Sequence, residues 1–215
     1  GGGTVTVSGV KAWSNTGGMD IVDYKLAGNT PLTISLSISG AQDTGFGTAT
    51  FRNIEGLAGS RGSDTFTDNA ADNQFEGRGG NDTFNLTGGG RDTLLYKLLS
   101  ASDATGGNGA DTVNRFEVGT FEATPNADRI DLKELLVGYT ADADGAARYI
   151  NGVAVIDSDD AIGNYLSVKV SGSNTTLSID RDGSGSAYSA TTLITLNGVT
   201  TDLATLLANH QIVLV

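Results

Sequence analysis

The residues best suited to chemistry are aspartates that recur in glycine-rich turns. Residues 59–67 read G-S-R-G-S-D-T-F-T, and residues 77–85 read G-R-G-G-N-D-T-F-N. Residues 106–114, G-G-N-G-A-D-T-V-N, match the template G-G-x-G-x-D-x-U-x at every fixed position, where U is hydrophobic. Glycines allow a tight turn with positive φ, which exposes the peptide carbonyls. Carboxylate and carbonyl oxygens are the ligands that Ca²⁺ takes, so these turns are candidates for binding calcium.

A weaker copy of the repeat lies between the first two. Residues 68–76 read D-N-A-A-D-N-Q-F-E in the same register, without the glycines and with Asn73 in place of aspartate. The hydrophobic position is kept, because Phe66, Phe75 and Phe84 are nine residues apart. A nonapeptide period of this type is the signature of a calcium-bound parallel β-roll, in which the eighth residue of each repeat points into the core.

The period predicts which aspartates stack on one another. Two nonapeptides make one coil, so Asp64 and Asp82, eighteen residues apart, should lie on one edge with one Ca²⁺ between their turns. On the opposite edge we expect Asn73, Asp92 and Asp111, each nineteen residues apart. The extra residue per step predicts an irregular stack there, and the neutral Asn73 predicts a weaker site at that step.

A second acidic pattern lies near the C-terminus. Residues 180–185, D-R-D-G-S-G, place carboxylates at alternate positions before a glycine, which is half of an EF-hand loop without its bidentate glutamate. A plain hairpin turn is the alternative. Residues 142–145, D-A-D-G, are a poorer version of the same pattern.

The candidate calcium ligands, counted as side-chain or backbone oxygens, come from these turns. They are Gly59, Arg61, Gly62, Asp64, Asn73, Gly77, Gly79, Gly80, Asp82, Gly89, Asp92, Gly106, Asn108, Gly109, Asp111, Asp180 and Asp182. Ordinary surface turns also contain glycine, asparagine and aspartate, but they do not repeat in strict register. A dinucleotide site is excluded, because no buried strand precedes these glycines and no amphipathic helix follows them.

Composition excludes several other classes of function. The chain has 215 residues and a net charge of −12, without a basic stripe that could neutralise nucleic-acid phosphates. It has no cysteine, which excludes disulfides and thiolate metal sites. No run of apolar residues is long enough to cross a membrane. His210 is the single histidine and no serine elbow is visible, so we expect no hydrolytic triad and no enzyme activity.

The elements expected around the repeats are mostly strands. Residues 4–57 alternate in polarity in the manner of strands that stack on the N-terminal end of the roll. Residues 94–101 interrupt the repeats with a short helix or an irregular edge. Asp131 is expected to cap a short helix over L-K-E-L-L, and Thr201 or Asp202 to cap a second one up to residue 209. Further strands are expected at 149–156, 165–171, 175–179, 192–197 and 211–215.

These elements predict an all-β fold, a parallel β-roll with extra N-terminal β-coils and a C-terminal β-rich cap that carries short helices. We expect N-terminal coils over residues 1–57, the nonapeptide roll over 58–116 and the cap over 117–215. The opening Gly1-Gly2-Gly3 favours a fragment of a longer protein.

The chain resembles the RTX region and the C-terminal type I secretion module of giant adhesins of Gram-negative bacteria. The resemblance rests on the nonapeptides, on D-R-I-D-L-K-E-L-L (residues 128–136) and on the ending L-I-T-L-N-G-V-T-T-D-L-A-T-L-L-A-N-H-Q-I-V-L-V (residues 193–215). It implies several Ca²⁺ ions, a roll that folds outside the cell, and an uncleaved export signal at the C-terminus. The implied partners are an ABC transporter, a membrane-fusion protein and an outer-membrane channel.

The resemblance further implies a secreted, non-catalytic, monomeric module that serves cell adhesion and biofilm formation at the cell surface. Two alternatives remain open at this point. The module could trail a secreted protease, lipase or epimerase whose catalytic domain lies upstream, or it could itself bind glycans through calcium.

Overall fold

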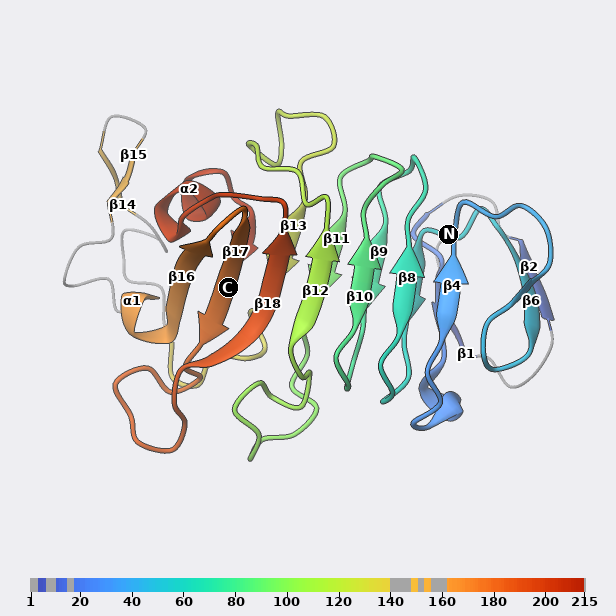
Figure 1. Cartoon of the computed structure of the whole chain (residues 1–215), viewed down its shortest axis with the longest axis horizontal. Coiled ribbons are helices and arrows are strands. Elements are labelled where there is room, and N and C mark those ends of the chain that lie inside the picture. Colours follow the sequence, from blue (N-terminus) through green and yellow to red (C-terminus); the bar gives the residue numbers. More distant parts are fainter. Residues whose placement is uncertain are drawn as a thin grey trace.

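The computed structural model describes residues 4–6, 11–14, 18–139, 148–150, 153–155 and 162–214. Two seven-stranded sheets that face each other form the framework of the fold, and each sheet is parallel over most of its width (Figure 1). We call the sheet nearer the viewer in Figure 1 the front sheet and the other one the back sheet. The all-β prediction is therefore confirmed, and the helices are short.

The chain alternates between the two sheets along the roll. The back sheet has the order β1 (Thr4–Thr6), β3 (Ile21–Asp23), β7 (Gly56–Ala58), β9 (Gln74–Glu76), β11 (Thr93–Leu95), β13 (Arg129–Asp131) and β19 (Ile212–Val213). The front sheet has the order β4 (Thr33–Ser35), β8 (Thr65–Thr67), β10 (Thr83–Asn85), β12 (Asp111–Asn114), β18 (Thr191–Asn197), β17 (Asn174–Ile179) and β16 (Leu166–Ser171).

Strand register confirms the predicted coil of two nonapeptides. Thr65 pairs with Thr83 and Phe66 with Phe84, eighteen residues later. The turns that join the sheets therefore stack into two edges. The lower edge consists of residues 24–32, 59–64, 77–82 and 96–110, and the upper edge of residues 68–73, 86–92 and 115–128 (Figure 1).

Hydrophobic side chains from the strand centres fill the space between the sheets. Phe66, Phe75 and Phe84 are fully buried, and their ring centroids lie 6.0–6.1 Å apart. The predicted inward direction of the eighth repeat position is thus confirmed. The remaining core residues continue this column in both directions, among them Val22, Ile34, Leu57, Leu94, Val113, Ile130 and Leu196.

Both sheets continue beyond the nonapeptides at each end. At the N-terminal side, β3 pairs with β7 and β4 pairs with β8, so the early coils do stack on the roll as predicted. A small sheet of β2 (Lys11–Ser14), β6 (Thr48–Arg52) and β5 (Gln42–Asp43) lies beside them, and η1 (Lys25–Ala27) is a single 3₁₀ turn.

At the C-terminal side, β18 joins β12 in parallel and leads into the antiparallel strands β17 and β16. The predicted strands at 165–171, 175–179 and 192–197 are confirmed to within one residue at each end. The strand prediction at 149–156 falls on the hairpin of β14 (Arg148–Ile150) and β15 (Val153–Val155), and its residues 151, 152 and 156 lie outside the described residues.

Of the two predicted helices, one is confirmed and one is wrong. The helix α2 (Leu203–Ala208) begins after Asp202, whose side chain accepts a hydrogen bond from the Thr205 N–H at 2.7 Å. Residues 132–136 instead form a turn, because Leu132 and Leu135 are drawn into the core over a segment too short to sustain a helix. Residues 94–101 start as strand β11 and then become irregular. The helix α1 (Ile162–Tyr165) is one turn long.

Candidate metal centres on the two edges

The lower edge contains a ladder of buried aspartates. Asp82 Oδ1 accepts a hydrogen bond from the backbone N–H of Asp64 at 2.7 Å, and Asp111 Oδ1 accepts one from the N–H of Asp82 at 2.8 Å. Asp64 in turn accepts from the Leu32 N–H at 2.8 Å. Each carboxylate therefore joins one coil to the preceding one, and one oxygen per carboxylate is used in this way.

The second carboxylate oxygens differ along this ladder. In Asp64 the second oxygen accepts from the Ser60 N–H at 2.7 Å, and in Asp111 it accepts from the Tyr96 hydroxyl at 2.9 Å. In Asp82 the second oxygen, Oδ2, is buried without a hydrogen-bond partner. A buried carboxylate oxygen without a partner carries a large desolvation cost, which a bound cation or a proton would relieve.

The pKa values of these three carboxyl groups reflect their burial and their closeness to one another. Burial, together with the neighbouring Asp111 and Asp64 carboxylates, raises the pKa of Asp82 to about 8. Burial also raises the pKa of Asp111 to about 7. The pKa of Asp64 is raised by burial as well, and the Arg78 guanidinium opposes that rise. Three stacked carboxylates in a dehydrated edge thus favour a cation between them.

Glycines are required where the carboxylates lie. A Cβ added at Gly77 would overlap Asp82 Oδ2, and one added at Gly59 would overlap Asp64 Oδ2, so each repeat reserves the space at its first position for its own aspartate. Gly80 has a φ of +105°, and a Cβ there would lie 2.6 Å from the Gly62 carbonyl oxygen of the preceding coil. Stacked peptide groups and one carboxylate per coil are therefore concentrated at this edge.

The upper edge contains a second ladder that is built from irregular spacings. Asp92 Oδ1 accepts from the Asn73 N–H at 2.8 Å, and Asp128 Oδ1 accepts from the Asp92 N–H at 3.0 Å. Asp92 Oδ2 is buried without a hydrogen-bond partner, as in Asp82. Burial and the neighbouring Asp128 raise the pKa of Asp92 to about 8, and burial raises the pKa of Asp128 to about 7.

A cavity of about 240 Å³ adjoins this second ladder. Its lining includes Asp92, Glu117 and Asp128 together with the glycine run 88–90 and Asn126. Asp68 lies in the preceding coil, fully buried, and accepts hydrogen bonds from the Thr87 and Gly88 N–H groups. The upper edge therefore brings four carboxylates, those of Asp68, Asp92, Glu117 and Asp128, close to one open cavity.

The structure corrects one predicted position. Asp111 was expected on the upper edge below Asp92, but it lies on the lower edge below Asp82, twenty-nine residues later. The lower-edge turn at 96–110 is longer than a nonapeptide turn, so the nineteen-residue interval from Asp92 ends on the other edge. Asn73 and Asp92 are on the upper edge as predicted, but the residue that follows them there is Asp128, thirty-six residues after Asp92.

The other predicted calcium ligands lie in the turns of their own repeats. Gly59, Arg61, Gly62, Gly77, Gly79 and Gly80 lie in lower-edge turns with Gly106, Asn108 and Gly109, and Gly89 lies in the upper edge. Asn108 is buried and its side-chain amide donates to the Lys97 and Thr105 carbonyls, both at 2.9 Å. These two hydrogen bonds therefore stabilise the long turn at 96–110.

Sequence reasoning missed Asp68, Asp128, Glu117 and Tyr96 as neighbours of the carboxylate ladders. Asp128 opens the D-R-I-D-L segment, in which only Asp131 had been given a structural role, as a helix cap. Asp131 instead ends strand β13, where it accepts from the Lys133 N–H at 3.2 Å. An aspartate two residues before an inward-pointing hydrophobe, as in the nonapeptides, is the signal that could have found Asp128.

The D-x-D-G-x-G loop is held by its own aspartate. Asp182 accepts hydrogen bonds from the Ala187 and Tyr188 N–H groups, which lowers the pKa of its carboxyl. Between the two aspartates, Arg181 is buried and donates to the carbonyls of Leu135 and Asp103 at 3.0 and 2.8 Å. The loop is thus attached to the lower-edge turn at 96–110. Calcium binding at Asp180 and Asp182 stays a prediction. The similar pattern at 142–145 lies outside the described residues.

Side chains alone do not complete a metal site. In the part of the chain that the structure describes, no three or more histidine, cysteine, aspartate or glutamate side chains are grouped so that they could hold a metal ion. Calcium at these edges would need backbone carbonyls beside one or two carboxylates. The unpartnered oxygens of Asp82 and Asp92 and the close-packed glycine turns fit that donor set.

His210, the single histidine, is exposed, and its Nδ1 lies 2.9 Å from Glu122 Oε2. No described helix is long and apolar enough to cross a membrane. No protein-family model matches the chain, and no curated protein matches it in sequence.

Proposed function

We propose that this chain is a calcium-dependent folding module of a secreted RTX adhesin and carries its type I secretion signal at the C-terminal end. The observation that carries the calcium part is the pair of carboxylate ladders, in which Asp82 and Asp92 each keep one buried oxygen without a partner. Calcium would bind these oxygens together with turn carbonyls and would offset the repulsion between neighbouring carboxylates. Several ions would then add their binding free energy to that of folding.

The secretion part rests on the sequence resemblance and on how the C-terminal segment is packed. Gln211 is fully buried, and its side-chain amide donates to the Glu117 and Asp128 carbonyls at 2.8 and 2.7 Å. The next residues form β19, which pairs with β13. A signal in this segment is therefore accessible only before the roll folds, which suits export from a compartment poor in calcium into one rich in it.

The calcium proposal predicts that metal removal unfolds the roll. Circular dichroism should report a change from coil to β-structure as Ca²⁺ is added, with a midpoint of about 10⁻⁴–10⁻³ M, the range of extracellular calcium modules. Mg²⁺ at the same concentration is the control, because its smaller shell demands near-ideal octahedral geometry. A complete β spectrum in excess chelator would refute calcium-dependent folding.

The secretion proposal predicts that deletion of residues 202–215 abolishes export of a fused passenger through a matching type I apparatus. Replacing Asp64 and Asp82 together with alanine is the matched control, since it leaves the C-terminal segment intact. That variant should be secreted more slowly, because folding outside the cell no longer opposes backsliding. Export of the truncated passenger at the intact level would place the signal elsewhere.

A further inference from the structure

The lower edge carries a groove whose charge is opposite to that of the protein. A cavity of about 980 Å³ runs across residues from successive lower-edge turns. Four of the thirteen lysines and arginines of the chain line it, namely Lys25, Arg61, Arg78 and Lys97, and Glu76 is the acidic residue among its lining. We call this cavity the basic groove. In a chain with a net charge of −12, such a concentration of cations is unexpected.

The four cations follow four neighbouring strands of the back sheet. Lys25 follows β3, Arg61 follows β7, Arg78 follows β9 and Lys97 follows β11. Neighbouring strands lie about 4.7–4.9 Å apart, so the cations are set out along the roll axis over about 14 Å. Each successive coil of the roll therefore adds one positive charge to this row.

Two of the cations are held in place by ion pairs. Arg78 contacts Asp23 at 2.9 Å and Glu76 at 3.3 Å, and its backbone has a φ of +70°. Lys97 Nζ lies 2.8 Å from the other oxygen of Glu76. Glu76 and Asp23 thus fix Arg78 and Lys97, and they leave a net positive charge among these six side chains.

The other two cations are available to a ligand. Lys25 and Arg61 are exposed, and their side chains make no hydrogen bond or ion pair with any residue that the structure describes. Leu26 and Leu99, which also line the groove, are 57% and 43% exposed. Four glycines are also part of the lining, so a ligand could approach the peptide groups closely; they are Gly28, Gly79, Gly80 and Gly107.

We propose that the basic groove binds a linear acidic polysaccharide that carries one carboxylate or sulfate group per sugar unit. Regularly spaced single charges match one cation per coil, and the exposed leucines offer apolar surface to the C–H faces of sugar rings. A nucleic acid is disfavoured, because its denser phosphate charge would meet the acidic remainder of the surface. The groove is lined by the same turns as the lower ladder, but the buried ladder aspartates Asp64, Asp82 and Asp111 are not among its lining residues.

The test is direct titration by calorimetry with a polyuronate oligomer of defined length, in buffer that contains enough Ca²⁺ to keep the protein folded. The same oligomer with its carboxylates reduced to alcohols is the neutral control, and dextran sulfate tests the sulfate form. Polyglutamate and a single-stranded oligonucleotide test the other polyanions. Binding to polyuronate or dextran sulfate that weakens as salt rises, with none to the neutral oligomer, is expected.

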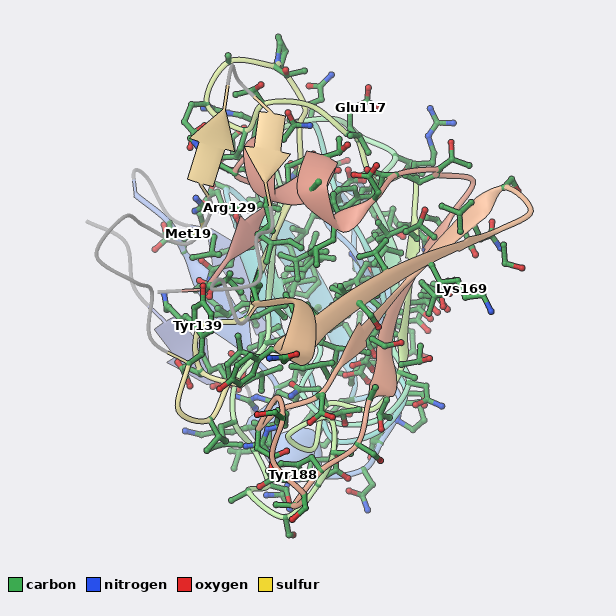
Figure 2. All side chains as sticks on the ribbon, turned by 90° about the vertical axis from the view of Figure 1, so that its left-hand side faces the viewer. Met19, Glu117, Arg129, Tyr139, Lys169 and Tyr188 are labelled. Carbon is green, nitrogen blue, oxygen red and sulfur yellow. The ribbon has the colours of Figure 1, made fainter. Side chains whose placement is uncertain are left out.

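Two double variants distinguish binding in the basic groove from non-specific electrostatic attraction to the rest of the surface. Lys25→Ala with Arg61→Ala should weaken binding roughly tenfold through loss of two charge contacts. Arg52→Ala with Lys169→Ala, two exposed cations outside the groove lining, should leave it unchanged; Lys169 lies on strand β16 (Figure 2). The calcium midpoint is measured for each variant, and the calorimetry is done at a Ca²⁺ concentration that saturates the folding of both, so that a binding loss is separated from calcium-dependent folding. Arg61→Ala keeps the backbone carbonyl through which Arg61 is a candidate calcium ligand.

Three outcomes would overturn the proposal. They are absence of binding to both acidic polysaccharides by the folded parent protein, equal weakening by the two double variants, and tighter binding to polyglutamate or to the oligonucleotide than to either polysaccharide. The last outcome would assign the groove to an acidic peptide or a nucleic acid instead.

Discussion

The two edges of the roll use the same contact but differ in how they are built. We call each residue of a ladder a rung. On each edge, an aspartate oxygen accepts a hydrogen bond from the backbone N–H of the preceding rung, at 2.7–2.8 Å on the lower edge and 2.8–3.0 Å on the upper edge. The lower ladder has a carboxylate at each rung, Asp64, Asp82 and Asp111. The upper ladder begins with neutral Asn73 and continues through Asp92 and Asp128. With the same backbone hydrogen bonds, the lower ladder therefore contains three carboxyl groups and the upper ladder contains two.

Support for the ladders also differs between the edges. The lower ladder is enclosed by repeat glycines such as Gly59 and Gly77 and ends at the Tyr96 hydroxyl. The upper ladder borders an open cavity, and the carbonyl of its last residue, Asp128, accepts a hydrogen bond from Gln211 of the C-terminal segment. The Asp128 carboxylate also accepts a hydrogen bond from the N–H of Glu117, a residue labelled in Figure 2, at 2.9 Å. The lower edge thus depends on local repeats, and the upper edge depends on a distant part of the chain.

The largest difference is expected from removal of one rung on each edge. Asp82→Ala removes a carboxylate between two others and should raise the calcium midpoint for folding roughly thirtyfold, equivalent to about 2 kcal/mol. Asn73→Ala removes only a neutral amide and should change the midpoint less than about fivefold, since a neutral hydrogen bond contributes about 1 kcal/mol or less. Calcium titrations followed by circular dichroism provide both midpoints.

A reciprocal pair of variants sharpens this comparison. Asp82→Asn keeps an acceptor for the Asp64 N–H but loses the charge, and Asn73→Asp adds a charge to the upper edge. The first should weaken calcium binding and the second should strengthen it. Equal midpoints for Asp82→Ala and Asn73→Ala would show that the edges do not differ in the way proposed.

A smaller difference is expected from glycine substitutions. Gly77→Ala places a methyl group on the Asp82 carboxylate and should lower the free energy of unfolding by about 1–3 kcal/mol, while also weakening calcium binding. Gly89→Ala on the upper edge meets only the Asn126 side chain, at 3.3 Å, and its φ of +82° should cost about 1 kcal/mol. Urea unfolding at fixed calcium measures both. A greater loss for Gly89→Ala would contradict the tighter packing of the lower edge.

The smallest difference between the edges is expected in the pH dependence of stability, which the two edges share. The pKa values of Asp82 and Asp92 are both about 8 in the folded protein, above their ordinary value of 3.8. The contribution of these two groups to the stability of the metal-free fold should therefore be fully present below about pH 4 and should be lost progressively as pH rises from about 4 to about 8, because the folded state holds the protons more tightly. Circular dichroism in chelator at several pH values provides the test, and the folded fraction should rise as pH falls from about 8 to about 4.

Calcium reverses the sign of this dependence, since protons compete with the metal for the same oxygens. The calcium midpoint should fall as pH rises toward 8. Asp82→Asn should remove one part of the dependence and Asp92→Asn another part of similar size. A metal-free protein that gains stability between pH 5 and pH 8 would show that these carboxylates are ionised in the folded state.

Sequence by itself determined the roll where the period is regular. Asp64 and Asp82, the inward phenylalanines and the glycines at the turns follow from an eighteen-residue coil, in which each residue stacks on its equivalent. The strands of the C-terminal cap and the helix capped by Asp202 were also predictable, because alternation and capping are local signals.

Tertiary structure alone decided where the period breaks. The long turn at 96–110 moves Asp111 to the lower edge, and the interval from Asp92 to Asp128 spans that turn and the next one. The basic groove and the contact of Gln211 with the Asp128 carbonyl join residues from separate coils. Such positions depend on how far an inserted segment extends before the chain rejoins the sheet, and residue spacing does not encode that length.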